Sequence, residues 1–449
     1  MFRNTQTARL SHFFAVTSAM PEPLAEINKF HRLTQPSTIS INKRVQLLDI
    51  LRGFALFGIL LVNANDYRFG PKTSDLHFNE LNLWFNNIVI AIGDGSFYPL
   101  FSMLFGIGFA IWMDKSMKQN GGTLRFAWRS FILLLLGCLF YIFIEDRNIL
   151  IRYSILSVPL LLFCKTGPKS LLVASILFFL VYIFYSPIHN QLIKPEPIGT
   201  SVHLTALEQA VLNAEQAAEK NPSYFNFTKA RLLQVPLQIR MCVTFDHPTL
   251  PIILSMFLLG AFFWRKKLLT NLERYYCIWL KTFWWGLIIG GGGNLFVFFE
   301  RIMFYKKIWV PNGPNVEVMH YVESIANPSL TLFYISLFAL AVRKRQGKPS
   351  KLLDMLASTG RIPLTNYFIQ YLIMSLLMVP YAFSLDRKLF TQQLCLITII
   401  VFVCQVIFSL FWVKRFIYGP MEWVWRSLTY LKFQPMKLSK WNNVKDKQD

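Results

Sequence analysis

The sequence predicts an all-α polytopic membrane protein with about ten transmembrane helices and both termini in the cytoplasm. Of its 449 residues, 54% are hydrophobic and only 16% are charged, which is more apolar surface than a soluble globular protein can bury. The apolar residues form blocks of roughly 15 to 25 residues that are nearly free of charge, close to the length of a membrane-crossing helix. Basic residues gather beside alternate blocks, as they do in the cytoplasmic loops of membrane proteins.

The apolar blocks are interpreted as spans in chain order, five before a long polar segment and five after it. A helix needs about 20 mostly apolar residues to cross the hydrocarbon core, and each block comes close to that length. The predicted spans cover residues 47–65, 97–113, 129–144, 149–164, 171–185, 248–264, 276–299, 322–342, 363–383 and 394–413.

An even number of spans places both termini on one side of the membrane. If that side is the cytoplasm, the N-terminal segment, the inner loops and the tail carry 29 of the 46 lysine and arginine residues, as the positive-inside rule requires. Their attraction to anionic lipid headgroups accounts for the net charge of +22 without nucleic acid as a partner. The six cysteines form no CxxC pair, so neither a disulfide framework nor a metal site is predicted.

The spans divide the chain into five regions. These are a basic cytoplasmic N-terminal extension (1–44), a first five-helix membrane half (45–186), an external loop (187–247), a second membrane half (248–435) and a basic cytoplasmic tail (436–449). Alanine, glutamate and leucine at helical spacing between His203 and Lys220 predict an amphipathic helix within the external loop. Two roles stay open for this loop: a hinge between the two halves, or a lid over an external site.

The first predicted span carries unusual polar residues. Asp49 and Arg52 are three residues apart and share one helix face near the predicted cytoplasmic end. They can simply neutralise each other, or they can form, with Arg44, a basic cluster around one acid that suits a phosphate-bearing ligand such as coenzyme A. Eleven residues after Arg52, roughly 16 Å along the helix, Asn63 lies at the external end.

Histidine is the natural candidate for a base on the external side, because its pKa is near neutral. Five of the seven histidines are predicted to be external. His320 and Glu323 share a helix face, and a histidine oriented by a carboxylate can act as a general base. The alternative is that both residues cap the eighth span at the wet interface.

Several segments resemble the bacterial DUF418 membrane proteins, also called the YeiB family. They include RVQLLDILRGFALFGILLVN (44–63), FYPLFSMLFGIGFAIW (97–112), GRIPLTNYFIQYLI (360–373) and YGPMEWVWRSLTY (418–430). Each block is weak alone, but their order along the chain is specific. The resemblance implies a multi-pass protein of the bacterial cytoplasmic (inner) membrane. Where the family usually has an Asp-Ile-Leu block, this chain has Asn148.

A more distant resemblance concerns activity. The pattern of Asp49, Arg52 and Asn63 is similar to the first helix of the transmembrane acyltransferases, including the heparan glucosaminide acetyltransferase. The acyltransferase-3 group tends to have a histidine at the position of Asn63, so a mechanism that needs a base there does not carry over. The heparan enzyme instead has a histidine after its first helix, and His77 is the histidine of the corresponding region here.

These observations predict a membrane acyltransferase that moves an acyl group from cytoplasmic acyl-CoA to an envelope glycan, lipid or small acceptor. The alternative is a transporter of a small solute, with the polar residues of the spans lining its path. The expected partners are membrane lipid and the acceptor, and a homo-oligomer is left open. The predicted catalytic residues are His77, His320, Glu323 and Asn63, and the predicted acyl-CoA-binding residues are Arg44, Asp49 and Arg52.

Overall fold

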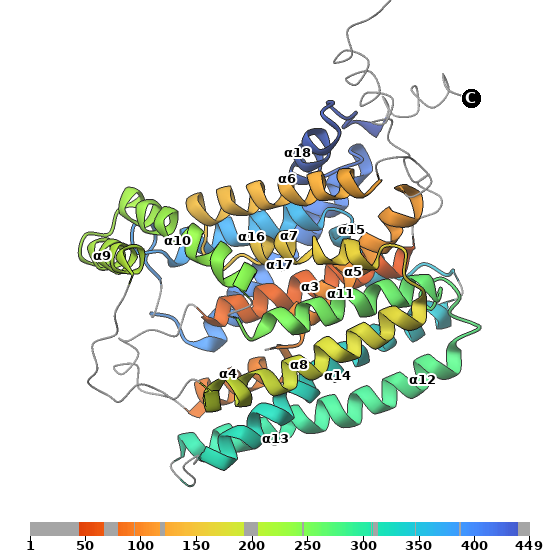
Figure 1. Ribbon diagram of the computed structural model, residues 1–449, viewed down its shortest axis with the longest axis horizontal. Coiled ribbons are helices and arrows are strands. Elements are labelled where there is room, and N and C mark those ends of the chain that lie inside the picture. Colours follow the sequence, from red (N-terminus) through yellow and green to blue (C-terminus); the bar gives the residue numbers. More distant parts are fainter. Residues whose placement is uncertain are drawn as a thin grey trace, which may run out of the picture.

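A computed structural model describes residues 45–438, with the exception of 67–79, 94, 117–121, 193–204, 245–246, 307, 309–312, 346 and 386–387. This part of the chain is helical apart from turns and one isolated antiparallel bridge between Phe416 and Lys437. Most of the helices lie side by side along the longest axis of the molecule (Figure 1). The all-α fold class is therefore confirmed.

The first half of the chain forms six α-helices and one 3-10 helix. In chain order they are α3 (Gln46–Asp66), α4 (Glu80–Gly93), α5 (Phe97–Ser116), α6 (Gly122–Phe143), α7 (Leu150–Leu156), η3 (Pro159–Phe163) and α8 (Pro168–Leu192).

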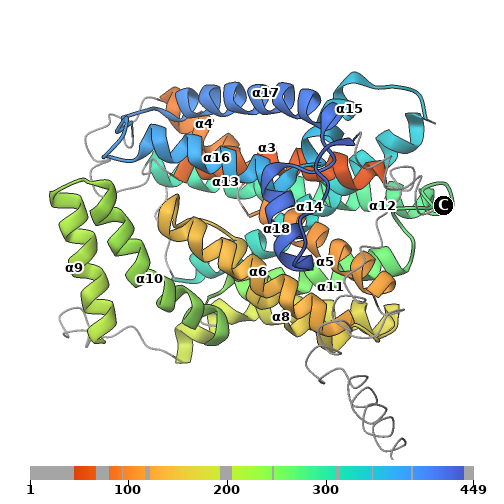
Figure 2. The ribbon, with the colours of Figure 1, turned by 90° about the horizontal axis from the view of Figure 1, so that it is seen from above.

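The second half forms a π-helical turn and ten α-helices, two of which, α9 and α10, project beyond the ends of the others (Figure 2). They are α9 (Ala206–Lys220), α10 (Tyr224–Thr244), α11 (Thr249–Arg265), α12 (Tyr276–Trp285), η4 (Gly286–Gly291), α13 (Gly292–Tyr305), α14 (Gly313–Arg345), α15 (Lys351–Gly360), α16 (Pro363–Met378), α17 (Thr391–Arg415) and α18 (Pro420–Tyr430). The helix predicted in the 187–247 loop is thus present as α9.

Among the described residues, seven helices are long and apolar enough to cross a membrane, or eight if the bent pair α10 and α11 forms one span. The count of ten predicted from the sequence is not reached. The segment 149–164 is the clearest difference, because α7 ends at Leu156 and the chain continues as a 3-10 helix from Pro159. Proline lacks the amide hydrogen that would continue an α-helix, so this apolar segment does not form one long helix.

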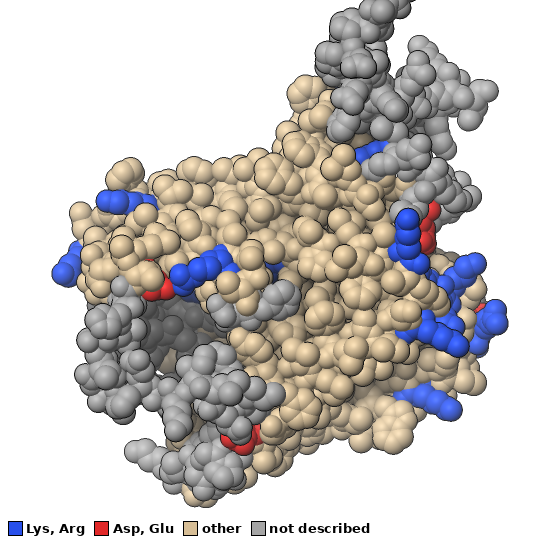
Figure 3. All heavy atoms as spheres, in the orientation of Figure 1, with Lys and Arg blue, Asp and Glu red and all other residues tan. Residues whose placement is uncertain are grey.

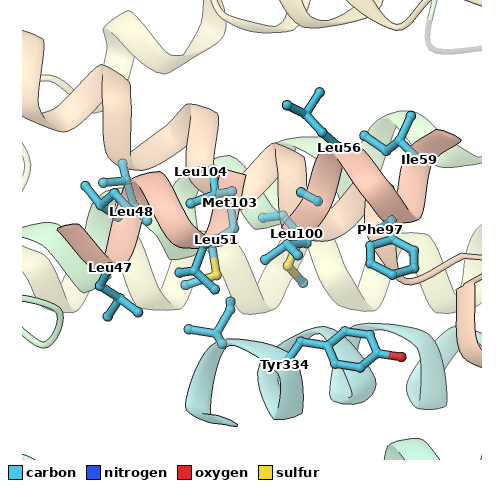
Figure 4. Close-up of a cluster of buried hydrophobic side chains, with 14 of the residues drawn as sticks. Leu47, Leu48, Leu51, Leu56, Ile59, Phe97, Leu100, Met103, Leu104 and Tyr334 are labelled. Atoms are coloured by element: carbon cyan, nitrogen blue, oxygen red, sulfur yellow. The ribbon is translucent and has the colours of Figure 1, made fainter. Parts of the chain in front are cut away.

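One hydrophobic core joins both halves of the sequence. Leu51 of α3 and Leu100 and Met103 of α5 are fully buried, and Tyr334 of α14 packs against the same cluster (Figure 4). Side chains from α11 and α16 complete it. The core therefore fixes the position of α3 relative to helices that follow it by about 300 residues.

Helix α15 lies directly against α3. A side chain at Gly53 would collide with the carbonyl oxygen of Leu356, and one at Gly360 would collide with the carbonyl oxygen of Asp49. Only glycine permits such close contact between two helix backbones. The contact lies at the level of Asp49 and Arg52, so it positions the polar turn of α3.

The two ends of the bundle differ in charge. We call the end where α3 begins and α14 ends the basic end, because lysine and arginine side chains gather there (Figure 3). The last turns of α11, α14 and α17 contribute Arg265, Arg343, Lys344, Arg345, Lys414 and Arg415. The α9–α10 hairpin and the last turn of α3 lie at the other end, which we call the opposite end (Figure 1).

Candidate functional site

The predicted polar pair of α3 is formed. An Nη1 atom of Arg52 lies 3.0 Å from Oδ1 of Asp49, and the two side chains are 26% and 11% exposed. The shared helix face is therefore confirmed, and the pair is partly withdrawn from solvent. Arg44, the third residue predicted for this site, lies outside the described residues.

Two further arginines join Arg52 at the basic end. The guanidinium of Arg129 on α6 interacts electrostatically with those of Arg52 and Arg426, and it lies 4.1 Å from the ring centre of Trp425. We call Arg52, Arg129 and Arg426 the arginine cluster. The cluster brings together three guanidinium groups, one of which, that of Arg52, is paired with the carboxylate of Asp49, so positive charge is in excess.

Helix α18 supplies part of this site, and a buried carboxylate holds the helix in place. Glu422 accepts hydrogen bonds from the backbone amides of Leu364 (2.6 Å) and Thr365 (3.1 Å) and from the Thr365 hydroxyl (2.5 Å). It thereby caps the N-terminus of α16 from a different helix. Burial raises the pKa of Glu422, although these hydrogen bonds act in the other direction. The cap fixes α18, and with it Trp425 and Arg426.

A groove of about 690 Å³ also opens at the basic end. It lies between the first residues of α3, the turn from α11 to α12 and the last turn of α14, with Val45, Asn271 and Arg343 among its lining residues. Arg343 donates to Glu273 at 2.9 Å. This volume falls in the range of about 300–1,000 Å³ that is typical of ligand and cofactor sites.

Asn63 lies at the opposite end of α3 and is fixed by a tyrosine. Its Nδ2 atom donates to the Tyr371 hydroxyl at 2.6 Å, and that hydroxyl donates to the carbonyl oxygen of Arg147 at 3.1 Å. The neighbouring Tyr367 hydroxyl accepts the amide hydrogen of Ile149 at 3.1 Å. Asn63 therefore belongs to a polar network that joins α3, α16 and the turn before α7.

This turn carries two carboxyl groups that the sequence analysis did not single out. Glu145 is only 2% exposed. Burial acts to raise the pKa of Asp146, but hydrogen bonding with Glu145 and the positive charges of Arg231 and Arg147 outweigh it, so the pKa lies below its usual value. Arg231 also donates to the carbonyl oxygen of Ile144 at 3.0 Å. The adjacent acids between two predicted spans were the available signal in the sequence.

Asn148, which stands where the resemblance expects aspartate, supports the start of α7. Its Oδ1 atom accepts the amide hydrogen of Leu150 at 3.2 Å. Its Nδ2 atom donates to the carbonyl oxygens of Gly137 and Glu145 at 3.3 and 3.4 Å. The carboxylates nearest to this position in the sequence are those of Glu145 and Asp146.

The predicted pairing of His320 with Glu323 is not formed. The carboxylate of Glu323 accepts a hydrogen bond from Arg301 at 2.8 Å, while Nε2 of His320 lies 3.5 Å from the Ser324 hydroxyl. A guanidinium on the neighbouring helix α13 is the stronger partner for the carboxylate, because the hydrogen bond is charge-assisted. His77, the other predicted base, lies outside the described residues.

These features define a class, the multi-pass α-helical membrane proteins, with polar groups at both ends of a helix bundle. Residues 263–432 match the family described as "Protein of unknown function (DUF418)". This match confirms the resemblance of the sequence blocks to the DUF418 proteins.

Relatives extend the similarity over most of the chain. "Uncharacterized protein YxaH" of Bacillus subtilis is 28% identical over 415 residues, which cover 88% of this chain and 96% of that protein. An "Uncharacterized 39.9 kDa protein in amylase 3'region" of Bacillus acidopullulyticus is 26% identical, with 90% and 98% covered. "Uncharacterized protein YeiB" of Escherichia coli is 25% identical, with 85% and 95% covered. No solved structure matches the chain.

Proposed function

We propose that the protein is a membrane acyltransferase that takes an acyl group from acyl-CoA at the cytoplasmic face and passes it to an envelope glycan, lipid or small acceptor. The arginine cluster is the observation that carries this proposal. Arginine binds phosphate through paired, charge-assisted hydrogen bonds, and coenzyme A carries several phosphate groups. Three guanidinium groups from α3, α6 and α18, with Asp49 paired to Arg52, suit such a ligand.

The groove at the basic end adds room for the donor. Its volume of about 690 Å³ suits the nucleotide part of a coenzyme, and Arg274 and Arg343 lie along it. The distance from Arg52 to Asn63 is roughly 16 Å along α3. An extended pantetheine arm is the part of the donor that would cover this distance through the bundle.

The reaction itself needs few groups. The acceptor hydroxyl or amine attacks the thioester carbonyl, so a carbon–oxygen or carbon–nitrogen bond forms and the carbon–sulfur bond breaks. A base takes the acceptor proton, and the released thiolate of coenzyme A takes a proton in turn. In this proposal His77 or His320 is the base, and the second amide hydrogen of Asn63 can donate to the developing oxyanion. Glu323 lines the acceptor side and holds Arg301.

The proposed orientation places both termini in the cytoplasm of a bacterial cell and the protein in the inner membrane. Its support is that α3 begins at the basic end and α17 ends near it with Lys414 and Arg415. An even number of crossings between them is then needed, and cytoplasmic ends are the basic ones. If α7 with η3, α11 and α16 also cross the membrane, the count of ten is reached.

The full-length protein, purified in lipid nanodiscs and incubated with labelled acetyl-CoA, tests this proposal. We expect saturable acetyl-CoA binding and transfer of label to an added acceptor. Arg52→Ala should weaken the binding, whereas Arg240→Ala should not, because Arg240 pairs with Glu208 at the opposite end. If the intact protein binds no acetyl-CoA, or both variants bind equally, the donor site does not exist.

A transporter is the second candidate, and broken helices favour it. α10 and α11 meet at 63°, and a π-helical turn, η4, lies within the continuous span from Tyr276 to Tyr305. Interrupted spans are typical of transporters, in which they line the solute site. Solute uptake into sealed vesicles without acyl donor would support the transporter and overturn the acyltransferase.

A further inference from the structure

A second polar site lies away from the arginine cluster, within the group formed by α4, α5, α8, α13 and α14 (Figure 1). It is a cavity of about 200 Å³. Its polar lining consists of Tyr98, Tyr182, Asn294, Arg301, Glu323 and Asn327. We call it the polar pocket.

Two buried polar atoms beside the polar pocket lack a hydrogen-bond partner among the described residues. The Nε atom of Arg301 and the Oδ1 atom of Asn327 are buried, and neither has a hydrogen-bond partner in the described part of the chain. Each such atom costs roughly 1–3 kcal/mol relative to a paired one. Both lie on apolar helices that are candidate membrane spans, where polar groups usually face a ligand, a partner or a path. Both atoms lie just behind the surface of the pocket, so a small rotation of either side chain would present one unused donor and one unused acceptor to a ligand.

The fold builds this arrangement with a glycine turn. Gly95, between α4 and α5, has φ +75°, and a side chain there would collide with the amide of Asn327. The turn is held against α14 by two hydrogen bonds, from the Thr331 hydroxyl to the Ser96 carbonyl (2.6 Å) and from the Tyr334 hydroxyl to the Ile92 carbonyl (2.7 Å). The position of Asn327 is thus set by the main chain of the turn.

Charge and size limit what the polar pocket can hold. Arg301 and Glu323 pair at 2.8 Å, and the carboxyl group of Glu300 interacts electrostatically with both. The site therefore carries no excess positive charge that would select an anion, and a neutral ligand can enter without separating the pair. The volume of about 200 Å³ equals roughly six or seven water molecules at about 30 Å³ each. That is enough room for glycerol or erythritol, whose own volumes are smaller. Hydroxyl groups, which both donate and accept, complement the two unused atoms.

We infer that the polar pocket binds a small neutral polyol, with one hydroxyl accepting from Arg301 Nε and another donating to Asn327 Oδ1. The binding itself does not depend on the acyltransferase proposal. Only the role of the polyol as the acceptor, or as the acceptor's hydroxyl-bearing headgroup, rests on that proposed function. The pocket would then hold the nucleophile at a site separate from the donor's phosphates.

Equilibrium binding of tritiated glycerol and erythritol to the full-length protein in nanodiscs tests this inference. We expect saturable binding to the wild type. Arg301→Lys keeps a cation opposite Glu323 but removes the Nε–H group, so it should weaken polyol binding roughly tenfold while the protein remains monodisperse. Asn327→Leu should weaken it to a similar degree, and Asn213→Leu, the same change on an exposed face of α9, should not.

Several results would overturn the inference. One is the absence of saturable polyol binding to the wild type, and another is wild-type affinity in both Arg301→Lys and Asn327→Leu. If Asn327→Leu does not fold, Arg301→Lys decides alone. Displacement of the polyols by glycine at lower concentration would show a site for zwitterions instead. Polyol binding without any acyl transfer from acetyl-CoA would support the pocket and count against the acyltransferase alone.

Discussion

The arginine cluster and the polar pocket differ in how their charged groups are paired. In the cluster, Arg129 interacts electrostatically with Arg52 and Arg426, and Asp49 pairs with Arg52, whereas the pocket pairs Arg301 with Glu323 and adds neutral amides. Excess positive charge selects an anion, and a balanced pair with unused hydrogen-bonding atoms selects a neutral ligand. One bundle thus presents two sites whose chemistry suits two different substrates.

The largest expected effect concerns the histidine that is proposed to take the proton of the acceptor. If His320 or His77 takes the acceptor proton, alanine at that residue should slow acyl transfer by roughly 100-fold to 10,000-fold, the usual range for a general base. Binding of acetyl-CoA should stay nearly unchanged. Transfer rates with labelled acetyl-CoA measure this. Wild-type rates in both His320→Ala and His77→Ala would remove histidine as the base.

The next effect concerns the cluster. Arg129→Gln should weaken acetyl-CoA binding by roughly 10-fold to 100-fold, because a hydrogen bond to a charged group contributes about 1.5–3 kcal/mol. Polyol binding should be unaffected, because Arg301 and Asn327 keep their positions. Equilibrium binding of both ligands to the same nanodisc sample measures the difference. A parallel loss of both affinities would mean that the variant damages the bundle and that the two sites are not separate.

The salt dependence of ligand binding should also distinguish the two sites, with a smaller effect. Raising the ionic strength shortens the screening length from about 10 Å at 0.1 M to about 3 Å at 1 M. Acetyl-CoA binding should therefore weaken several-fold, while glycerol binding should hardly change because that ligand is neutral. Titrations at the two salt concentrations measure this. A polyol affinity that falls as steeply as the acetyl-CoA affinity would contradict the assignment of a neutral ligand.

The smallest effect concerns the α9–α10 hairpin at the opposite end. A hydrogen bond from the Thr205 amide, together with Arg240, lowers the pKa of Glu208 from 4.5 to about 2. Because the folded pKa lies below the unfolded one, this carboxylate stabilises the start of α9 above about pH 4.5, and the contribution disappears as the pH falls through about 2. The protection of the first-turn amides of α9 against hydrogen exchange, corrected for the intrinsic exchange rate at each pH, should fall with acid. Glu208→Gln should remove this dependence, and Glu219→Gln should leave it intact.

Local spacing predicted what lies on one helix. The fold class follows from hydropathy, and the Asp49–Arg52 pair follows from a separation of three residues. Hydropathy counts apolar residues but not main-chain donors, so the span predicted at 149–164 missed the break at Pro159. Partly for this reason, seven or eight helices of the described chain are long enough to be candidate spans, and the count of ten stays a prediction.

Contacts between distant helices were beyond the sequence. Arg129 on α6 interacts electrostatically with Arg52 on α3 and with Arg426 on α18, and nothing in the local sequence points to this. Tyr371 binds Asn63 across 308 residues. Glu323 shares a helix face with His320 as predicted, but Arg301 on another helix holds the carboxylate. Each of these partners depends on the tertiary packing.

The close contact at Gly53 and Gly360 holds α3 in a fixed position against α15. Because backbone meets backbone there, α3 cannot slide or turn against α15 without a collision. The rise of the α-helix sets roughly 16 Å between Arg52 and Asn63, and the contact with α15 keeps both residues at fixed positions in the bundle. Under the proposed function, a donor whose pantetheine arm is shortened by a few bonds would bind through its phosphates, but its thioester would not reach Asn63.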